Sequence, residues 1–498
     1  MRALSLLAGG FGLLISAQLQ ALSLDIPRPA PPTDDRRDIA LSGLAIQPVL
    51  RAAAPVAISP RLRAADWHSA GDGRAVWSLT LSSVDAHYLG LRFDRPQLPE
   101  GTELRLIGAD GQTRGPYGPE AINGRRELWV PLVHGSRAEL ELRAPAAATS
   151  EVQLGEVEVH YGLRRLDGAG TKAQGDAGDC HNDVACPQGN GWDSAIRSTT
   201  LLVIGNQLVC NGVLLNNTRQ DGDPLLITAD HCGIRSDENP EGFPADSVIA
   251  VFNFQARRCG SNSNVDQQDR IEGAALLYRD RLSDTSLIRL ERAPPDAFGA
   301  RFAGWDASGS GAASGSGVHH PAGDLKKISL FEQPLQAQTV TISGGGIRTE
   351  SQEVASWRVD WNDGVTERGS SGSGIWNPQQ RLLGVLSGGS SECGTNGLLG
   401  IGGQPDIQGP DFYGRLAVAF DSAGELGTPL RAFLDPSGSG ARRVNARGAV
   451  GAPSGPPESS DGTGAGGGDS GGGALGALSL LLLSSLAASR RRFSFSRP

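Results

Sequence analysis

The sequence predicts an all-β protein with two folded parts, and two observations support this fold class. In the first part, six segments alternate polar with apolar residues, and turn residues such as those at 108–111 separate them. Short alternating strands at this spacing are typical of a β-sandwich. The second part continues with strand-like apolar runs and contains all six cysteines. The six segments of the first part are 75–81, 89–93, 103–107, 127–132, 138–142 and 157–161.

The 498 residues of the chain fit two or three folded units with appendages. Residues 1–21 contain Arg2, an apolar run from Ala3 to Ile15 and small residues near the end, which indicates a secretory signal peptide. A membrane anchor is the alternative, but the run is short for one. Residues 22–65 are rich in Pro, Ala and Arg, so we expect a flexible leading segment.

The carboxyl end has the composition of a linker followed by a sorting tail. Residues 448–470 are mostly Gly, Ser, Pro and Asp. Residues 471–498 begin with glycines, continue with an apolar run barely long enough to cross a bilayer, and include three successive arginines. This tail resembles the GlyGly-CTERM signal of Gram-negative bacteria, which implies a rhomboid-type sorting protease as a partner. A permanent anchor is the alternative to transient tethering before release or surface display.

Charge and cysteine content restrict the classes of partner. The net charge of -9, and the lack of a basic run that offers a phosphate-binding face, exclude nucleic acid. Six cysteines in an exported chain predict three disulfides, although the count alone leaves fifteen connectivities open. A zinc site is the alternative, but the spacings lack a paired metal-binding motif. The cysteines are Cys180, Cys186, Cys210, Cys232, Cys259 and Cys393.

Three distant stretches predict a nucleophilic serine with its base. Ser371 lies on the glycine-flanked turn 369–373, His231 follows the apolar run 225–229, and Asp284 precedes another apolar strand. A serine hydroxyl needs a base, and the base needs a carboxylate that fixes its tautomer. Ser371 is therefore the candidate nucleophile, His231 the general base and Asp284 the orienting group. The backbone amides of Gly369 and Ser371 are the candidate oxyanion hole.

Other titratable residues have simpler interpretations. Asp230 precedes the candidate base, and adjacent residues at a strand end usually point apart, so we do not assign it to the site. The histidines of the first part are scattered and form no convergent set, so we expect them at the surface or at strand ends. They are His68, His87, His134 and His160.

The order His231, Asp284, Ser371 along the chain is that of chymotrypsin-type proteases. The region 173–446 resembles the lysyl endopeptidase branch of the trypsin-like serine proteases. The resemblance implies a chymotrypsin-like double β-barrel at 173–447, preceded by a propeptide at 22–172 that contains the sandwich. It rests on the stretches 228–232, 319–327, 365–373 and 411–415. It implies the disulfides Cys180–Cys393, Cys186–Cys259 and Cys210–Cys232.

The resemblance also implies where substrate binds. Trypsins use an aspartate six residues before the nucleophile, but this chain has Val365 there, and the family's pocket carboxylate corresponds to Asp411. A compact ammonium suits a single buried carboxylate, whereas a guanidinium needs a bidentate site, so cleavage after lysine is expected. Ser387, Gly388 and Gly389 are expected to pair with the substrate backbone.

Two residues depart from the family pattern. Ser387 replaces the histidine of the best-known members, and most trypsin-like enzymes use a serine there to support the catalytic aspartate. The accompanying aromatic residue also has no counterpart, with Ser343 nearest. We expect the triad to survive these changes, and the sequence leaves the pH optimum and the substrate affinity open.

Lysine usage points to self-processing. Only Lys172, Lys326 and Lys327 among 45 basic residues are lysines, although a GC-rich genome that favours arginine is an alternative explanation. Lys172 lies in a polar linker eight residues before Cys180, so we expect autoprocessing between Lys172 and Ala173. The residue before the nucleophile is Ser370, not the aspartate that binds the new amino terminus of trypsin, so activation must differ. We expect Cys180 and Cys186 to fix the mature terminus, and the propeptide to assist folding and block the site.

The sequence therefore predicts an exported serine endopeptidase that needs no cofactor and works as a monomer on lysine-containing proteins or peptides. One alternative keeps this chemistry with arginine or mixed specificity. A second alternative is a surface binding protein built on a retired protease fold.

Overall fold

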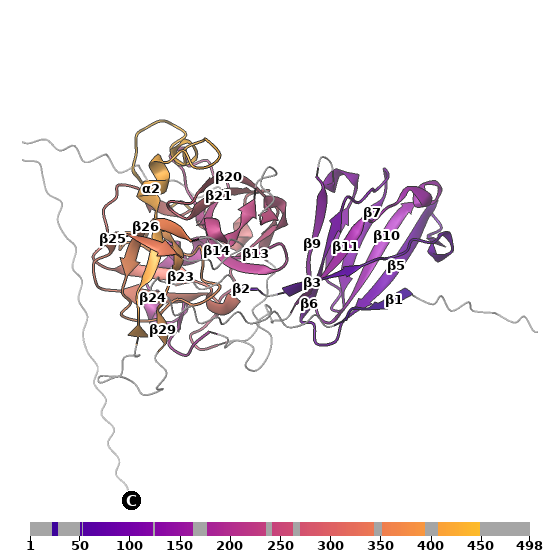
Figure 1. Cartoon of the computed structure of the whole chain (residues 1–498), viewed down its shortest axis with the longest axis horizontal. Helices are drawn as coiled ribbons and strands as arrows, with labels where there is room; N and C mark the ends of the chain where they lie inside the picture. The colour runs from indigo at the N-terminus through magenta and orange to yellow at the C-terminus, as the bar shows by residue number, and fades with distance from the viewer. Residues whose placement is uncertain are drawn as a thin grey trace, which may run out of the picture. The chain divides into compact units, whose positions relative to one another are not determined.

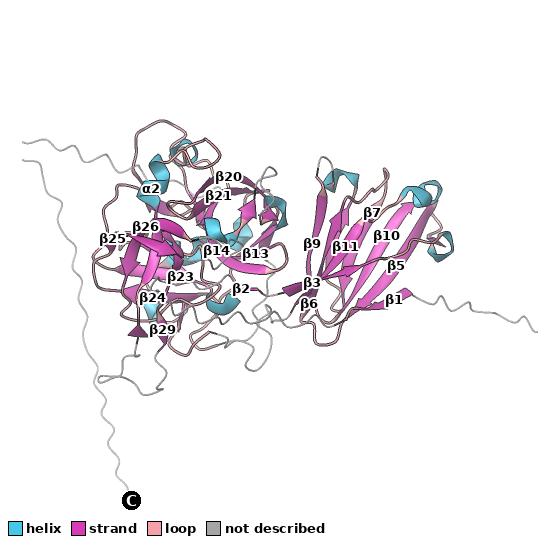
Figure 2. Ribbon diagram, in the orientation of Figure 1, coloured by secondary structure: helices cyan, strands magenta, loops and turns pink. Residues whose placement is uncertain are grey.

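The computed structural model is mostly β-strand, with three short α-helices in the described part of the chain, α1 (Asp193–Ser198), α2 (Leu416–Asp421) and α3 (Arg431–Leu434) (Figures 1 and 2). The predicted all-β class is therefore confirmed. Two compact units divide the chain at residue 456, and all described residues belong to the first. The structure describes residues 22–27, 50–51, 53–122, 125–162, 177–235, 242–261, 269–342, 351–393 and 407–448.

Residues 53–162, with 22–27, form two sheets that share one apolar core. The first sheet has the order β1-β5-β10-β7-β8 with β4 paired to β5, and the second has the order β3-β11-β6-β9. Every second residue of β5 is buried, which is the pattern of a half-buried strand. Their bounds are β1 Leu22–Asp25, β3 Ala53–Ile58, β4 His68–Ser69, β5 Arg74–Ser82, β6 Tyr88–Asp94, β7 Glu103–Gly108, β8 Thr113–Tyr117, β9 Glu127–His134, β10 Arg137–Pro145 and β11 Glu156–Gly162.

The six predicted segments of this part correspond to β5, β6, β7, β9, β10 and β11. The expectation of a flexible segment over 22–65 is wrong where this stretch is described. β1 pairs in parallel with β5, and β3 pairs antiparallel with β11. Both strands lie at a sheet edge, where Pro55 of β3 breaks no interior ladder. Proline is therefore compatible with a strand at this position.

His160 is also not the surface or strand-end residue that we expected. Its side chain is fully buried on β11, and its ring lies 5.3 Å from that of Trp129. Burial, followed by the nearby positive charge of Arg92, lowers the pKa of His160 to about 3. The residue is therefore a neutral core histidine.

The second part is built on two larger sheets, as expected for a chymotrypsin-like fold. The first has eight strands in the order β19-β18-β13-β14-β15-β21-β20, with β2 paired to β14. Its turn at 205–207 closes a hairpin between β13 and β14. The bounds are β2 Leu50–Arg51, β13 Thr199–Ile204, β14 Leu208–Leu215, β15 Leu225–Ala229, β18 Val248–Val251, β19 Arg270–Glu272, β20 Ala274–Asp280 and β21 Thr285–Leu290.

The second sheet has ten strands in the order β12-β24-β23-β27-β28-β31-β26-β25, with β22 and β32 attached through β28. An apolar core cluster that includes Val213, Trp305 and Val385 contains residues of both sheets. The bounds are β12 Asn182–Asp183, β22 Gly304–Asp306, β23 Gly315–His319, β24 Lys327–Phe331, β25 Gln336–Ile342, β26 Gln352–Val359, β27 Gly374–Trp376, β28 Arg381–Gly389, β31 Asp411–Arg415 and β32 Arg443–Val444.

Three disulfides confirm the implied connectivity: Cys180–Cys393, Cys186–Cys259 and Cys210–Cys232. All six cysteines are thereby bonded, which leaves no thiolate for the alternative zinc site. Cys210–Cys232 joins β14 to the 3-10 turn η5 (Asp230–Cys232), which carries His231.

Several predicted features lie outside the described residues, namely the signal peptide at 1–21, the tail at 471–498, Lys172 with Ala173, and Ser343. Within the described ranges, the helices are too short or too polar to cross a membrane.

Candidate active site

His231 and Asp284 form a buried pair on the first of the two larger sheets. β15 ends at Ala229, and the turn η5 then presents His231. The ring Nδ1 of His231 lies 2.7 Å from Asp284 Oδ2. The backbone N–H of His231 donates to Asp284 Oδ1 at 2.9 Å. Asp284 is fully buried and His231 is 4% exposed. Two bonds from one residue therefore fix both oxygens of the carboxylate.

This geometry gives His231 the properties of a base. Burial lowers the pKa of the imidazole, but the charge and hydrogen bond of Asp284 outweigh it, so the pKa is raised. Donation from Nδ1 to the carboxylate leaves the lone pair on Nε2, which has no partner in the described part of the chain. Asp230 faces Arg279 instead, with its Oδ1 3.0 Å from Arg279 Nε, which supports leaving it out of the site.

Ser371 lies on a turn that is hydrogen-bonded to the first of the two larger sheets. The backbone N–H of Asn211 on β14 donates to Ser371 O at 2.7 Å, and its side-chain amide donates to Gly369 O at 2.6 Å. A Cβ at position 372 would lie 2.4 Å from Thr228 Oγ1, so glycine allows this close approach to β15. The turn of Ser371 is thus brought to the strand that leads to His231.

A further backbone contact orients the candidate oxyanion donor at Gly369. Gly369 has a φ of 90°, and the preceding carbonyl, that of Arg368, accepts the N–H of Ala322 at 2.7 Å. Because the peptide plane is fixed by its oxygen, its N–H at Gly369 points the opposite way. Among the described residues, neither this N–H nor that of Ser371 has an acceptor. Two backbone donors without an acceptor are what an oxyanion requires.

Asp411 is a fully buried carboxylate at the start of β31. Its Oδ2 accepts from Trp361 Nε1 at 2.6 Å, Thr366 Oγ1 at 2.7 Å and Ser391 Oγ at 2.6 Å. Its Oδ1 accepts the N–H of Ser391 at 3.2 Å. Burial raises the pKa of Asp411, although these hydrogen bonds oppose the rise. The Oδ1 atom has the greater remaining capacity to accept a donor.

Gly389 lies opposite Asp411 in the β28–β31 ladder. A Cβ at Gly389 would lie 2.0 Å from Asp411 Oδ1, so any side chain there would crowd the carboxylate. β27 pairs with β28 at residues 382–385 and ends before 387–389. Among the described strands, β27 therefore does not pair with β28 at Ser387, Gly388 and Gly389.

The expected support of Asp284 by Ser387 is not observed. Ser387 is fully buried, and its Oγ has no hydrogen-bond partner in the described structure. Both oxygens of Asp284 already accept from His231, and a register shift occurs between Leu386 and Gly388. The serine is therefore present without the bond that its position implied.

Sequence reasoning missed Asn211 and Ala322, whose hydrogen bonds orient the backbone at 368–371, next to the candidate nucleophile. Asn211 interrupts an apolar strand, and a buried amide requires hydrogen-bond partners, so its polarity was a usable signal. Ala322 has a φ of 54°, in the left-handed region, and nothing in the sequence marks that conformation for an alanine.

The all-β fold and the family matches that follow define the class of the protein as a serine endopeptidase. The chain belongs to the lysyl endopeptidase family. Residues 174–406 match the family's model for the C-terminal domain, and residues 45–157 match its model for the N-terminal domain. A lysyl endopeptidase of Pseudomonas aeruginosa is 30% identical over 352 residues, which cover 66% of this chain and 72% of that protein.

Solved structures show more distant similarity. The active form of the Rv3671c protease from M. tuberculosis is 14% identical, with a TM-score of 0.31, over 50% of this chain and 88% of that one. A serine endoprotease from Yersinia pestis is 12% identical, with a TM-score of 0.26, over 47% of this chain and 64% of that one.

Proposed function

We propose that this serine endopeptidase cleaves peptide bonds after lysine through Ser371, His231 and Asp284. The observation that carries the proposal is the buried carboxylate of Asp411, across the ladder from Gly389. It supplies a negative charge where the family resemblance expects the substrate's lysine. Ser387, Gly388 and Gly389 would bind the substrate backbone along β28.

The chemistry follows from the donors and acceptors of the site. Ser371 Oγ attacks the scissile carbonyl carbon while His231 Nε2 takes the hydroxyl proton. The resulting oxyanion accepts from the N–H groups of Gly369 and Ser371. The amine leaves with the proton from His231, which gives an acyl-enzyme, and water then repeats the sequence to release the acid. Asp284 stabilises the imidazolium in both halves.

The hydrogen bonds of Asp411 favour lysine over arginine. Three donors already bind Oδ2, so a guanidinium cannot form two parallel bonds to this carboxylate. An ammonium needs one accepting oxygen, and Oδ1 provides it.

A set of ester substrates tests this specificity. We expect kcat/KM for a lysyl ester to exceed that for the matched arginyl ester by at least about 100-fold, or about 2.7 kcal/mol at 1.36 kcal/mol per tenfold. A norleucyl ester of the same length controls for the apolar part of the side chain. Equal rates for lysyl and arginyl esters would favour the mixed-specificity alternative, and faster arginyl cleavage would favour the arginine alternative.

We also propose that the precursor processes itself between Lys172 and Ala173, which releases residues 22–172 as a propeptide. The other two lysines are shielded from cleavage. Lys326 is 1% exposed and donates to Ile196 O at 2.8 Å, and Lys327 is ion-paired to Asp183 at 2.6 Å. A lysine-specific enzyme would therefore leave its own protease part intact.

Lys172→Arg is expected to leave the precursor uncut, because arginine does not satisfy the pocket proposed above. Electrophoresis and mass spectrometry of the product report the outcome. Lys327→Arg is the matched control, since it also removes a lysine but keeps a cation beside Asp183, and it should mature normally. Normal maturation of Lys172→Arg would show that processing does not depend on this lysine.

The same proposal includes secretion, a monomeric mature enzyme and sorting by the tail at 471–498 through a rhomboid-type protease. Mass spectrometry of the secreted product would identify both ends of the mature chain.

A further inference from the structure

A chain of hydrogen bonds connects residues 365–371, here called the nucleophile turn, to β23 and β24. The chain passes through one buried histidine, His319. Ser329 Oγ donates to Val365 O at 2.8 Å, so its lone pairs are available to His319 Nε2 at 3.2 Å. The other ring nitrogen of His319, Nδ1, lies 2.8 Å from Ser370 Oγ. Ser370 Oγ also accepts the N–H of Glu367 at 3.2 Å.

The bond directions in this chain follow from the number of available hydrogens. The Ser329 hydroxyl is committed to the Val365 carbonyl, so His319 must donate from Nε2–H. Neutral His319 then has a lone pair on Nδ1, which accepts the hydroxyl of Ser370. Val365 lies at the start of the nucleophile turn and Ser370 near its end. One imidazole therefore braces both, Val365 through Ser329 and Ser370 directly.

The surroundings of His319 favour this neutral form. The ring is fully buried, and burial together with His181, His320 and Lys327 holds the pKa of His319 well below its usual value. Protonation of Nδ1 would replace the acceptor of the Ser370 hydroxyl with a second donor. The brace therefore depends on an uncharged imidazole.

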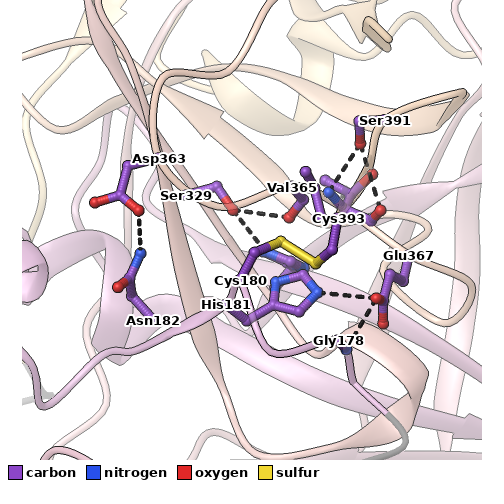
Figure 3. Close-up of a disulfide and its surroundings, with 12 residues drawn as sticks. Gly178, Cys180, His181, Asn182, Ser329, Asp363, Val365, Glu367, Ser391 and Cys393 are labelled. Atoms are coloured by element: carbon purple, nitrogen blue, oxygen red, sulfur yellow. Dashed lines mark hydrogen bonds and ion pairs between the residues drawn. A yellow bond between two sulfur atoms is a disulfide. The ribbon is translucent and has the colours of Figure 1, made fainter. Parts of the chain in front are cut away.

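The segment that follows the proposed cleavage site packs against the same turn (Figure 3). Glu367 accepts the N–H of Gly178 at 3.0 Å and lies 3.3 Å from His181 Nε2, next to the Cys180–Cys393 disulfide. The ring of His181 also lies 5.5 Å from that of His319. These contacts begin at Gly178, so a cut between residues 172 and 173 removes none of them.

We propose that His319 is a positioning residue that holds the oxyanion donors in place through Ser370, independently of a free amino terminus. This inference rests on the proposed function. In trypsin, an ion pair of the new amino terminus with the aspartate before the nucleophile orders the site, and here the neutral imidazole of His319 has that role. Both partners of the bond exist in the uncleaved chain. The precursor therefore has a formed nucleophile turn before any cut, which self-processing requires.

Kinetics of mature variants test the brace. We expect His319→Leu and Ser370→Ala to lower kcat for a lysyl ester by about 100-fold, the cost of losing an oxyanion donor, with KM within threefold. His319→Asn keeps an acceptor near the Nδ1 position and should retain more activity than His319→Leu. His320→Asn is the matched control, because His320 is equally buried but its ring binds Asp324 O and lies over Phe254.

A second readout separates positioning from general damage. Binding of a lysyl aldehyde, which forms a tetrahedral adduct with the nucleophile, should weaken by the same factor as kcat, whereas binding of a lysine amide should not change. If His319→Leu does not fold, Ser370→Ala alone decides the result. A kcat within threefold of wild type for Ser370→Ala, or equal losses in His320→Asn, would overturn the proposal.

Independence from the amino terminus has its own test. Carbamylation of the mature α-amino group with cyanate should leave kcat within threefold of the untreated enzyme, and a loss above about 30-fold would contradict the proposal. These outcomes are separate from failure of the proposed function, which would appear as full activity in Ser371→Ala.

Discussion

Ser371→Ala is expected to lower kcat for a lysyl ester by about a million-fold, the loss seen when a serine protease nucleophile is removed. The methyl side chain cannot form an acyl-enzyme, whereas the oxyanion donors and Asp411 remain. KM should change little, because the substrate-binding groups are intact. The variant should also accumulate as uncut precursor if processing is intramolecular.

Labelling by an organophosphonate measures this result directly, since the reagent bonds to the nucleophilic oxygen. The label should disappear in Ser371→Ala and persist in Ser373→Ala. Ser373 is a suitable control because it lies two residues further along the same turn and is also buried. Equal labelling of Ser371→Ala and wild type would instead favour a different nucleophile, and no labelling of wild type would favour the surface-binding alternative.

Alternation of polar and apolar residues was sufficient to predict the sandwich strands with two neighbours, and also the edge strand β9. β5 and β10 lie inside their sheet and alternate along most of their length, and both were predicted close to their observed bounds. The edge strands β1, β3 and β8 were not predicted. They are short or contain proline, and the partner strand rather than local preference determines their conformation.

The parts of the site that short sequence motifs and cysteine positions mark could be predicted. The pairing of His231 with Asp284 and the three disulfides agree with the resemblance. The support of Asp284 that trypsin-like enzymes obtain from a serine at the position of Ser387 is not observed, since its Oγ has no hydrogen-bond partner in the described structure. The brace through His319 joins residues 51 positions apart, so only the folded sheets bring it together.

Asp411→Asn is expected to lower kcat/KM for a lysyl ester by about 1,000-fold, since removing one member of a buried charge pair costs about 4 kcal/mol. The amide is nearly isosteric, so the loss reports charge rather than shape. A norleucyl ester is the control, and its kcat/KM should stay within about threefold because its side chain makes no ion pair. A similar loss with both esters would mean that Asp411 supports the fold of the pocket and does not read the substrate's charge.

The same pair of esters isolates the titration of Asp411 from that of His231. Both esters need neutral His231, so the ratio of their kcat/KM values cancels its protonation. Burial raises the pKa of Asp411, and only its ionised form attracts an ammonium. The lysyl-to-norleucyl ratio should therefore be full at neutral pH and should fall, as the pH is lowered, at a higher pH than an ordinary aspartate would give. In Asp411→Asn the ratio should be low and independent of pH, and a ratio that still falls with acidity there would assign the titration to another group.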